Sequence, residues 1–465
     1  MGLRLFNTLS GRAEPFEPMD GRTVRMYTCG PTVYHYVHIG NFRTFAFQDI
    51  LRRYLTYRGY RLDHVMNITD VEDKIIRNAG EAGKSLREYT EVYQKAFEED
   101  ARKLRLQTPE RVVRATDHIP EMTDAIEELG RRGLTYQSDG SVYYRIAGFP
   151  GYGKLSRIDT SGMRAGARVD LDEYEKADAR DFVLWKATKP GEPCWESPFG
   201  PGRPGWHIEC SAMAMKYLGE TLDIHAGGVD LVFPHHENEI AQAEGITGKP
   251  FVRFWLHAEF LQIDGQRMAK SLGNFYTLRD ILEKGHAPEA VRYLLASVPY
   301  RKQLNFTFDA LKSAATAIER LRNFRLRLDT DRLEPGESDA LTRLGMEARQ
   351  QFEAGLDDDL NTAQALGAVF EYVREVNTRM DAGEFRQGNL AGARDLLGLF
   401  DRIFDVLEPS REGQMSAEEI DRAIAERLAA RKARDFARAD QVRQDLAAKG
   451  VVLEDTKDGT RWKRQ

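Results

Sequence analysis

Near its N-terminus the chain reads Val24-Arg25-Met26-Tyr27-Thr28-Cys29-Gly30, which has the composition of a buried strand, and Pro31 then ends regular structure. After a loop, residues 42–57 carry apolar side chains at helical spacing, and Gly59 supplies a helix stop. Residues 61–68 have the pattern of a second strand. Strand, helix and strand in this order predict an α/β protein with a doubly wound, Rossmann-type sheet.

The rest of the chain divides by composition. Residues 154–204 are rich in Gly, Pro, Asp and Arg, which indicates part of an insertion between two halves of the sheet. Strand-like residues return at 221–225. From Leu311 onward, apolar residues spaced by three and four predict helices almost throughout. A loop at residues 409–415 then separates a last small module that carries a basic helix.

The overall composition excludes several classes of protein. The chain has 465 residues, enough for about three domains of roughly 150 residues. It has no apolar run long enough for a membrane span and no secretory signal pattern, so we expect a cytoplasmic protein. Its three cysteines, Cys29, Cys194 and Cys210, are too few for a disulfide framework. The net charge of −6 means that any nucleic-acid contact needs a local basic face.

One group of residues has the chemistry of a metal site. Cys210 is followed in the sequence by a polar cluster that begins at Pro234, and a helix starting there would place His235 and Glu239 on one face. With Cys29, these side chains are good zinc ligands. The same residues are also consistent with small core cysteines or with an acid–base cluster that binds no metal. Spacing alone does not bring Cys29 near Cys210.

Two short loops have features of a nucleotide site. Residues 35–41 lie between the first strand and its helix, where helix N–H groups favour anions, and Gly40 would let a flat base approach the backbone. Residues 267–274 carry Arg267 and Lys270 in a loop that contains glycine, and Lys270 could neutralise triphosphate charge. Each loop alone is equally consistent with an ordinary solvated turn.

Several strings in these regions resemble the signatures of one family. His38-Ile39-Gly40-Asn41 resembles the HIGH signature of class I aminoacyl-tRNA synthetases, and Arg267-Met268-Ala269-Lys270-Ser271 resembles their KMSKS signature. Four more strings narrow the resemblance to the cysteinyl-tRNA synthetases: Tyr27-Thr28-Cys29-Gly30-Pro31-Thr32-Val33-Tyr34, Asn67-Ile68-Thr69-Asp70, Gly205-Trp206-His207-Ile208-Glu209-Cys210-Ser211-Ala212-Met213 and Pro234-His235-His236-Glu237-Asn238-Glu239. The resemblance extends over nearly the whole chain.

The resemblance implies a domain plan. It implies a class I Rossmann catalytic domain over residues 1–310, with an inserted region at about 115–205 and a signature-loop and stem-contact region at about 255–310. An α-helical bundle over residues 311–408 and a small anticodon-binding module over residues 409–465 would follow. The implied partners are ATP, L-cysteine and tRNA(Cys), with no membrane contact and a monomeric state.

The resemblance also implies roles for individual residues. One zinc ion would recognise the substrate thiol, held by Cys29, Cys210, His235 and Glu239. ATP, accompanied by Mg²⁺, would be bound by His38, Gly40, Asn41, Gly227, Gly228, Asp230, Arg267 and Lys270. Thr69, Trp206 and His225 would line the amino-acid pocket, and Arg431, Phe436 and Asp440 would contact the anticodon. From pattern alone, the glycine pair is consistent with a turn, Trp206 with a core residue, and the basic helix with an ordinary amphipathic one.

Three positions depart from the signatures. Asn41 replaces the second histidine of HIGH, Ala269 replaces a serine, and Arg267 replaces a lysine. Asn41 can donate a hydrogen bond but cannot carry charge, whereas Arg267 keeps the charge with a different geometry.

Two rival functions remain open at the level of sequence. One is a cysteine ligase that uses a small amino-sugar acceptor, and the other is a zinc-stabilised RNA-binding protein with an inactive nucleotide site.

Overall fold

The computed structural model describes residues 2–158, 181–409, 417–433, 435–448, 451–456 and 459–464. The chain divides into two compact units, Met1–Leu407 and Glu408–Gln465. Residues 159–180 of the expected insertion lie outside the described residues, and so does the side chain of Lys270.

The larger unit is built on a five-stranded sheet in the order β11-β10-β3-β4-β5. Its strands are β3 (Thr23–Thr28), β4 (Arg61–Ile68), β5 (Arg111–Arg114), β10 (Leu222–Gly228) and β11 (Val252–Ala258). Every neighbouring pair is parallel. From β3 the chain adds strands on one side through β4 and β5, and later on the other side through β10 and β11. The predicted doubly wound sheet is confirmed, and its order reverses between β3 and β10.

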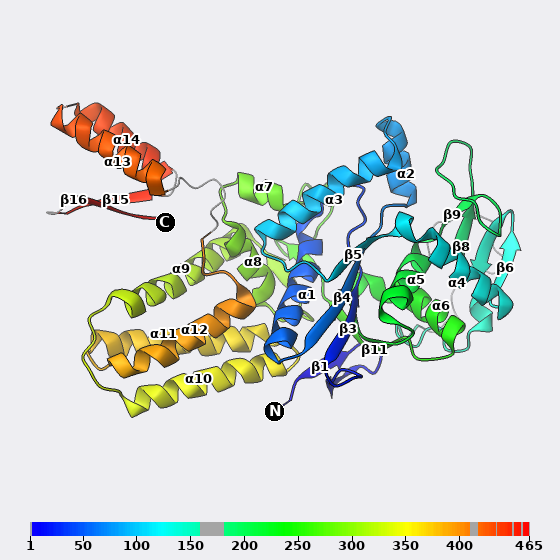
Figure 1. The fold of residues 1–465 in the computed structure, drawn as a ribbon, viewed down its shortest axis with the longest axis horizontal. Helices are drawn as coiled ribbons and strands as arrows, with labels where there is room; N and C mark the ends of the chain where they lie inside the picture. The colour runs from blue at the N-terminus through cyan, green and yellow to red at the C-terminus, as the bar shows by residue number, and fades with distance from the viewer. Residues whose placement is uncertain are drawn as a thin grey trace. The chain divides into compact units, whose positions relative to one another are not determined.

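Helices cover both faces of this sheet (Figure 1). Helix α1 (Ile39–Tyr57) packs against β4 and β10, and its apolar side shares a core with Met26 of β3. Helix α5 (Trp206–Leu218) packs against β3 and β4 and shares a second core with Tyr27. Successive residues of β3 thus face opposite cores, as the alternation of a strand requires. This burial on both faces explains why the strand sequences are apolar runs.

Helix α1 begins three residues before the predicted start at residue 42. The cause is its N-cap: the His38 side chain accepts a hydrogen bond from the Asn41 N–H, with a donor–acceptor distance of 3.1 Å. A histidine ring nitrogen replaces the usual Ser, Thr, Asp or Asn oxygen at this position.

Between β5 and β10 the chain forms a separate antiparallel sheet with the order β6-β7-β8-β9. Its strands are β6 (Thr135–Ser138), β7 (Ser141–Tyr144), β8 (Phe182–Ala187) and β9 (Gly202–Pro204), and helix α4 (Ile119–Arg131) precedes them. The remaining elements before the bundle are β1 (Arg4–Asn7), β2 (Arg12–Pro15), α2 (Asp73–Glu81), α3 (Leu86–Lys103), α6 (Glu237–Thr247), β12 (Leu261–Ile263), β13 (Gln266–Arg267), α7 (Leu278–Glu283), α8 (Pro288–Ser297) and β14 (Leu304–Phe306).

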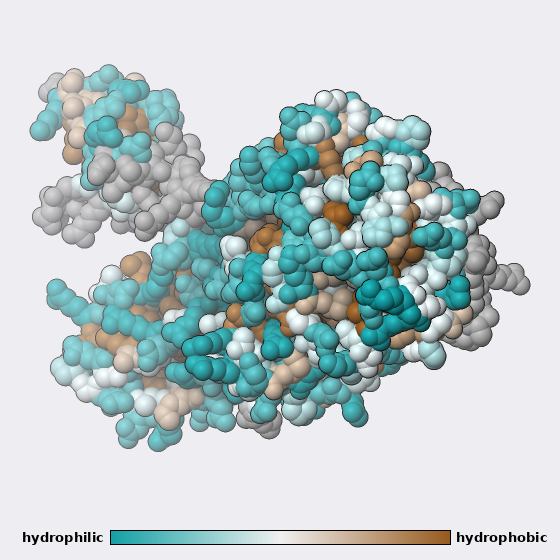
Figure 2. Space-filling model, turned by 45° about the vertical axis from the view of Figure 1, so that its right-hand side comes forward, coloured by the Kyte–Doolittle hydropathy of each residue, from teal (hydrophilic) through white to brown (hydrophobic). Residues whose placement is uncertain are grey.

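The predicted helices after Leu311 form a bundle, drawn from yellow-green to orange in Figure 1. They are α9 (Phe308–Thr330), α10 (Asp339–Asp357), α11 (Thr362–Asp381) and α12 (Leu390–Phe404). None of the helices that the structure describes is long and apolar enough to cross a membrane. Hydrophilic side chains cover most of the face shown in Figure 2, and apolar ones form separate small patches.

The smaller unit contains α13 (Ala417–Lys432), α14 (Phe436–Ala448), and the antiparallel strands β15 (Val451–Thr456) and β16 (Gly459–Arg464). The prediction of almost exclusively helical structure is wrong for this hairpin. Val451 and Leu453 lie in the same small core as Ile420 and Leu446 of the helices. The β-branched run at 451–452 favours an extended chain, and each strand supplies the hydrogen-bond partner that the other needs.

A buried ion cluster ties α1 to later parts of the larger unit. Asp49 of α1 is 2% exposed and forms ion pairs with Arg53, at 2.8 Å, and with Arg292 of α8, at 2.5 Å. Burial alone would raise the pKa of Asp49, but the charges of Arg292 and Arg53 hold that pKa below its usual value. The cluster therefore keeps three charges ionised inside the protein.

Replacing this carboxylate should destabilise the larger unit. Asp49→Asn keeps the shape of the side chain but leaves the buried guanidinium of Arg292 without its ion-pair partner, whereas Arg53 keeps Asp405 at 2.9 Å. We expect a loss of about 3–5 kcal/mol. Urea unfolding followed by tryptophan fluorescence measures the loss. Asp309→Asn is the control, since Asp309 is 91% exposed and forms an ion pair with the exposed Lys312. It should cost below about 1 kcal/mol. Equal effects of the two variants would contradict the proposed role of Asp49.

Candidate functional site

A cavity of about 340 Å³ opens where the carboxyl ends of β3, β4 and β10 meet. Ligands of open α/β sheets bind at this kind of position, where the strand order reverses. Nine of the residues singled out from the sequence line it: Cys29, His38, Asn41, Thr69, Trp206, Cys210, Gly228, Asp230 and His235. Segments far apart in the chain thus contribute to one hollow.

Three side chains that line this cavity and one buried beside them converge on one point. The sulfur atoms of Cys29 and Cys210 are 3.9 Å apart, too far for a disulfide. Nε2 of His235 lies 3.4 Å from the Cys210 sulfur and 3.0 Å from Oε1 of Glu239. Oε1 of Glu239 lies 3.9 Å from the Cys29 sulfur. All four ligand atoms are within 4.8 Å of one another, and all four residues are buried.

This donor set fits a metal ion. A tetrahedral site with bonds of about 2.3 Å to sulfur separates its two sulfur atoms by about 3.8 Å, close to the distance found between Cys29 and Cys210. Two thiolates, an imidazole and a carboxylate are also ligands that soft and borderline metals accept. The group could therefore hold a metal such as zinc.

A second set of donors shares two members with the first. It consists of Cys29, His225, His236 and Glu239, whose ligand atoms also lie within 4.8 Å of one another. Only Cys29 of this set lines the cavity, whereas three members of the first set do. A metal ion that has to contact a molecule in the cavity is therefore more favourably bound by Cys29, Cys210, His235 and Glu239.

The charges of the cluster support the same conclusion. Burial would raise the pKa of Glu239, but His225 and His235 hold it at about 2. Burial works to lower the pKa of His235, whereas Cys210 and Glu239 raise it to about 10. Burial opposes ionisation of Cys210 too, yet the Cys29 thiol and the charge of His235 lower its pKa. The protein thus stabilises a thiolate and a carboxylate side by side in its interior, an arrangement that attracts a cation.

The amino-acid pocket residues predicted from the sequence occupy different places. Trp206 lines the cavity, and its ring stacks on His235 with the centroids 4.3 Å apart. Thr69 lines it too and donates a hydrogen bond of 2.9 Å to the buried Glu209. His225 does not line the cavity; its Nε2 lies 2.8 Å from Oε2 of Glu239, so it orients that carboxylate from behind.

Sequence reasoning missed a chain of polar groups behind the cluster. Nε2 of His236 lies 3.4 Å from the Cys29 sulfur, and its Nδ1 lies 2.8 Å from Nε2 of His257. His257 in turn contacts the Thr8 hydroxyl at 2.7 Å through Nδ1. His236 directly follows His235 in the sequence, so its role beside the cluster could have been predicted. The contact of Thr8 with His257 could not, because only the fold brings the segments of β1 and β11 together.

The two nucleotide loops meet at the start of α1. A Cβ atom on Gly40 would lie 3.0 Å from Cε of Met268, so the second loop packs against the first. Asn274 closes the second loop: its Oδ1 accepts from the Ala269 N–H at 2.8 Å, and its Nδ2 donates to the Arg267 carbonyl at 3.1 Å. Arg267 is exposed and does not line the cavity.

Gly227 and Gly228 are the last residues of β10 and do not form a turn after it. A Cβ on Gly227 would lie 2.9 Å from the His236 ring, and a Cβ on Gly228 would lie 2.3 Å from Oδ1 of Asp230. The pair therefore lets β10 end close to the cluster. Arg431, Phe436 and Asp440 belong to the smaller unit, where all three are exposed, Phe436 at 61%.

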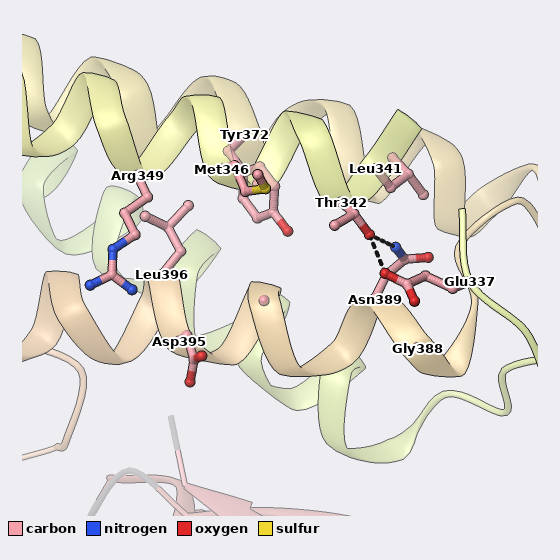
Figure 3. Close-up of a pocket in the computed structure, with 12 residues that line it drawn as sticks. Glu337, Leu341, Thr342, Met346, Arg349, Tyr372, Gly388, Asn389, Asp395 and Leu396 are labelled. Atoms are coloured by element: carbon pink, nitrogen blue, oxygen red, sulfur yellow. Dashed lines mark hydrogen bonds between the residues drawn. The ribbon is translucent and has the colours of Figure 1, made fainter. Parts of the chain in front are cut away.

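A smaller hollow of about 260 Å³ lies among α10, α11 and α12 (Figure 3). In it, the Thr342 hydroxyl donates to Glu337 at 2.7 Å, and Nδ2 of Asn389 donates to Thr342 at 2.9 Å. None of the site residues predicted from the sequence lines it. It also lacks the thiols and imidazoles that give the first cavity its chemistry.

Comparison with known proteins gives a consistent result. A family model described as the catalytic domain of class I (C) tRNA synthetases matches residues 15–316, and a DALR domain model matches residues 351–408. A cysteine–tRNA ligase of Solibacter usitatus is 64% identical over 466 residues, covering 100% of both chains. Those of Koribacter versatilis and Leptospira interrogans are 53% and 48% identical, each over 100% of this chain and at least 99% of the relative.

Solved structures share the fold at low identity. A methionyl-tRNA synthetase of Mycobacterium tuberculosis in complex with methionyl-adenylate has a TM-score of 0.61 at 15% identity, covering 83% of this chain and 90% of that one. A putative arginyl-tRNA synthetase of Campylobacter jejuni has a TM-score of 0.54 at 13% identity, covering 83% and 92%.

The close approach of β3 and β4 at the cavity is testable. A Cβ on Gly30 would lie 1.7 Å from the Asn67 carbonyl oxygen, so Gly30→Ala must push the two strand ends apart. We expect a loss of stability of about 1–3 kcal/mol or more, seen as a lower thermal unfolding midpoint. Gly80→Ala in α2 is the control, because a Cβ there meets nothing within 4 Å. An unchanged midpoint for Gly30→Ala would show that the strand ends are not held this closely.

Proposed function

Because the chain belongs to the cysteine–tRNA ligases, a family of class I aminoacyl-tRNA synthetases, we propose that it activates L-cysteine with ATP and transfers it to tRNA(Cys). In the first step the cysteine carboxylate attacks the α-phosphate of ATP, giving cysteinyl-adenylate and pyrophosphate. In the second, a terminal ribose hydroxyl of the tRNA takes the cysteinyl group and AMP leaves. The observation that carries the proposal is the convergence of two thiols, an imidazole and a carboxylate, three of which line the cavity at the HIGH-like helix start.

The metal of the cluster is zinc in this proposal, one ion per chain, held by Cys29, Cys210, His235 and Glu239. When bound, zinc supplies a soft partner for the substrate thiolate, which the hydroxyl of serine replaces poorly. A pocket that used shape alone would separate cysteine from serine by only about 1–3 kcal/mol. Selectivity therefore requires a difference in bonding chemistry.

The protein side chains position the amino acid. Trp206 stacks on His235 and forms one wall of the cavity, so it limits the size of the substrate side chain. Thr69, beside the buried Glu209, contributes a polar wall near the end of β4. His225 keeps Glu239 oriented and acts through that carboxylate, without touching the substrate.

The ATP phosphates bind at the start of α1 in this proposal. His38 and Asn41 line the cavity at the start of α1 and would contact the phosphate oxygens. Gly228 and Asp230 border the space proposed for adenosine. Gly40 and Gly227 let Met268 and His236 pack close beside it. Lys270 and Arg267 belong to the loop that packs on Gly40 through Met268, and they would neutralise the leaving pyrophosphate with Mg²⁺.

Two regions are proposed to contact tRNA. The match to the DALR domain covers the end of α10 together with α11 and α12, and the smaller unit follows it. Phe436 exposes an aromatic ring on which an unpaired base could stack, with Arg431 and Asp440 on the same helix pair to contact base edges. The monomeric state and cytoplasmic location remain predictions from the sequence.

The comparisons do not support an amino-sugar acceptor, because the relatives are tRNA ligases over their full lengths. The second rival, an RNA-binding protein with an inactive nucleotide site, predicts no cysteine-dependent exchange of pyrophosphate into ATP. The proposed function predicts that this exchange occurs.

Removing one thiol should abolish metal binding and selectivity together. Cys210→Ser is expected to reduce zinc from about one ion per chain to below about a tenth, measured by elemental analysis after dialysis, because a structural thiolate ligand is lost. We expect the preference for cysteine over serine in pyrophosphate exchange to fall at least ~10-fold.

Cys194→Ser is the matched control, since Cys194 is exposed and lies outside the cluster. It should retain both the zinc and the preference. Full cysteine preference in protein that lacks zinc would refute the zinc-based selectivity.

Loss of the exposed aromatic ring should affect only the tRNA step. Phe436→Ala removes a stacking surface worth about 1–3 kcal/mol, so we expect the KM for tRNA(Cys) to rise about 5- to 150-fold. Pyrophosphate exchange should be unchanged. Met346→Ala removes a side chain of equal exposure, 61%, from α10 and serves as the control. A Phe436→Ala variant that charges tRNA normally would exclude stacking at this position.

A further inference from the structure

The rim of the first cavity carries a cluster of aromatic side chains. The loop after β3 supplies three members of this rim cluster and α3 supplies the fourth: Tyr34, His35, Tyr36 and Tyr93. The first three also line the cavity. The ring of His35 stacks on that of Tyr93 with the centroids 5.9 Å apart, and Tyr36 meets Tyr93 edge to face at 5.4 Å. Aromatic rings thus continue outward from the cavity wall.

The rim cluster is held on a buried foundation. Tyr89 of α3 is 9% exposed, and its hydroxyl donates a hydrogen bond of 2.9 Å to the Tyr34 carbonyl. Its ring packs with Ile75 and Ala79 of α2, and Tyr34 and Tyr93 lie against the same small core. Helices α2 and α3 also pack against each other (Figure 1). This close packing holds the loop and its rings in place.

Tyr36 is the exposed member of the rim cluster. Among the tyrosines that the structure describes, it is the most exposed, at 38%. The guanidinium of Arg279 lies over its ring, 5.2 Å from the centroid, and is itself paired with Glu99 at 2.7 Å and Asp100 at 3.1 Å. The anchored cation fixes the orientation of the ring. An aromatic surface that is exposed within a cluster, at the mouth of a cavity, indicates a partner.

The rim also carries a cation. Lys74 of α2 lines the cavity, and its ammonium lies 5.5 Å from the centroid of the Tyr34 ring. No carboxylate in the described part of the chain pairs with this ammonium, whereas the neighbouring Asp73 pairs with Lys186 at 2.8 Å. An anionic chain that lies along the rim would therefore gain the attraction of Lys74.

The order of the sheet separates the rim cluster from the space proposed for adenosine. Gly228 and Asp230 belong to the end of β10, which pairs with one edge of β3. Lys74 belongs to the helix that follows β4, which pairs with the other edge of β3. Cys29 follows β3 itself, between the two. A chain that enters along the rim therefore approaches Cys29 from the side away from the adenosine space.

We propose that the rim cluster and Lys74 are the docking site for the unpaired 3′ end of the tRNA, with Tyr36 stacked on the base next to the terminal nucleotide. Proteins bind unpaired bases by stacking them on aromatic rings, and every base offers such a face. Lys74 contacts a phosphate of the same strand. The strand then leads the terminal ribose into the cavity, where its hydroxyl takes the cysteinyl group. This inference rests on the proposed function, because only the second step brings the RNA end to the cavity.

Photocrosslinking locates the tRNA end directly. When irradiated, a tRNA(Cys) with 5-iodocytidine next to its terminal nucleotide forms a bond, with loss of iodine, to an aromatic ring stacked on that base. With the full chain, mass spectrometry should assign this crosslink to Tyr36. Tyr36→Phe keeps a ring and should keep the crosslink, whereas Tyr36→Ala should lose it. A crosslink confined to residues outside the rim cluster would overturn the proposal.

Charging kinetics measure the contribution of the ring. Tyr36→Ala should raise the KM for tRNA(Cys) about 5- to 150-fold, the effect of losing one stacked base, with a smaller change in kcat. Tyr36→Phe should restore the KM of the unmodified chain. Val92→Ala is the control, since Val92 is adjacent to Tyr93 in α3 but is 45% exposed and does not line the cavity. An unchanged KM in Tyr36→Ala would contradict stacking at Tyr36.

The salt dependence of tRNA binding tests Lys74. Loss of one phosphate contact to a single strand should reduce the slope of log Kd against log salt concentration by about 0.7 in Lys74→Gln. Lys84→Gln removes an exposed cation from the turn between α2 and α3, away from the cavity, and should keep the slope. Equal slopes for the two variants would contradict a phosphate contact at Lys74.

Pyrophosphate exchange separates this inference from the proposed function, because the exchange needs no tRNA. A chain without cysteine-dependent exchange that still crosslinks at Tyr36 would keep the docking site and overturn the proposed activity. A chain that exchanges pyrophosphate normally but gives no crosslink at Tyr36 would keep the proposed activity and overturn the docking site.

Discussion

The parallel pairing of β3 with β10 is the constraint on which the rest of the larger unit depends. It aligns Met26 with Ile224 and Thr28 with Ala226, so the two strands end side by side. Cys29 follows one end directly, and Gly228 closes the other. Parallel strands direct their carboxyl ends to the same edge, and the reversal of strand order between these two opens a crevice there. Cys29, His38 and Asn41 reach the crevice from the end of β3 and the start of α1, and Gly228, Asp230 and His235 reach it from the end of β10. Thr69 comes from the end of β4, and α5 brings Trp206 and Cys210.

Burial of the four donors is costly unless a cation accompanies them. A thiolate and a carboxylate side by side in a water-poor interior repel each other, and a single imidazolium compensates only in part. Metal binding and the stability of this region are therefore expected to be linked, because the ion would repay the desolvation of its ligands. The outer groups, His225 on Glu239 and Trp206 on His235, restrict the ligands to one arrangement.

Helix α1 connects the cavity to the buried ion cluster as one rigid element. Its first turn borders the candidate nucleotide site, and Asp49 anchors it to Arg292. A small shift at one side chain of a packed helix is transmitted along it, because close packing leaves little freedom for local adjustment.

Local sequence was sufficient for the strands at 24–30 and 61–68, for the helix between them and for the family resemblance, because short-range periodicity and contiguous signature strings carry that information. It was also sufficient to nominate Cys29, Cys210, His235 and Glu239. It misjudged the hairpin at the C-terminus, where strand pairing within the small unit outweighs helical spacing. The sequence did not predict that Cys29 and Cys210, which are 181 residues apart, would lie side by side. It also did not predict the chain of polar groups from His236 to Thr8. Both arise because the strands of the sheet are assembled in one order. Contacts between distant segments depend on packing, which no local pattern encodes.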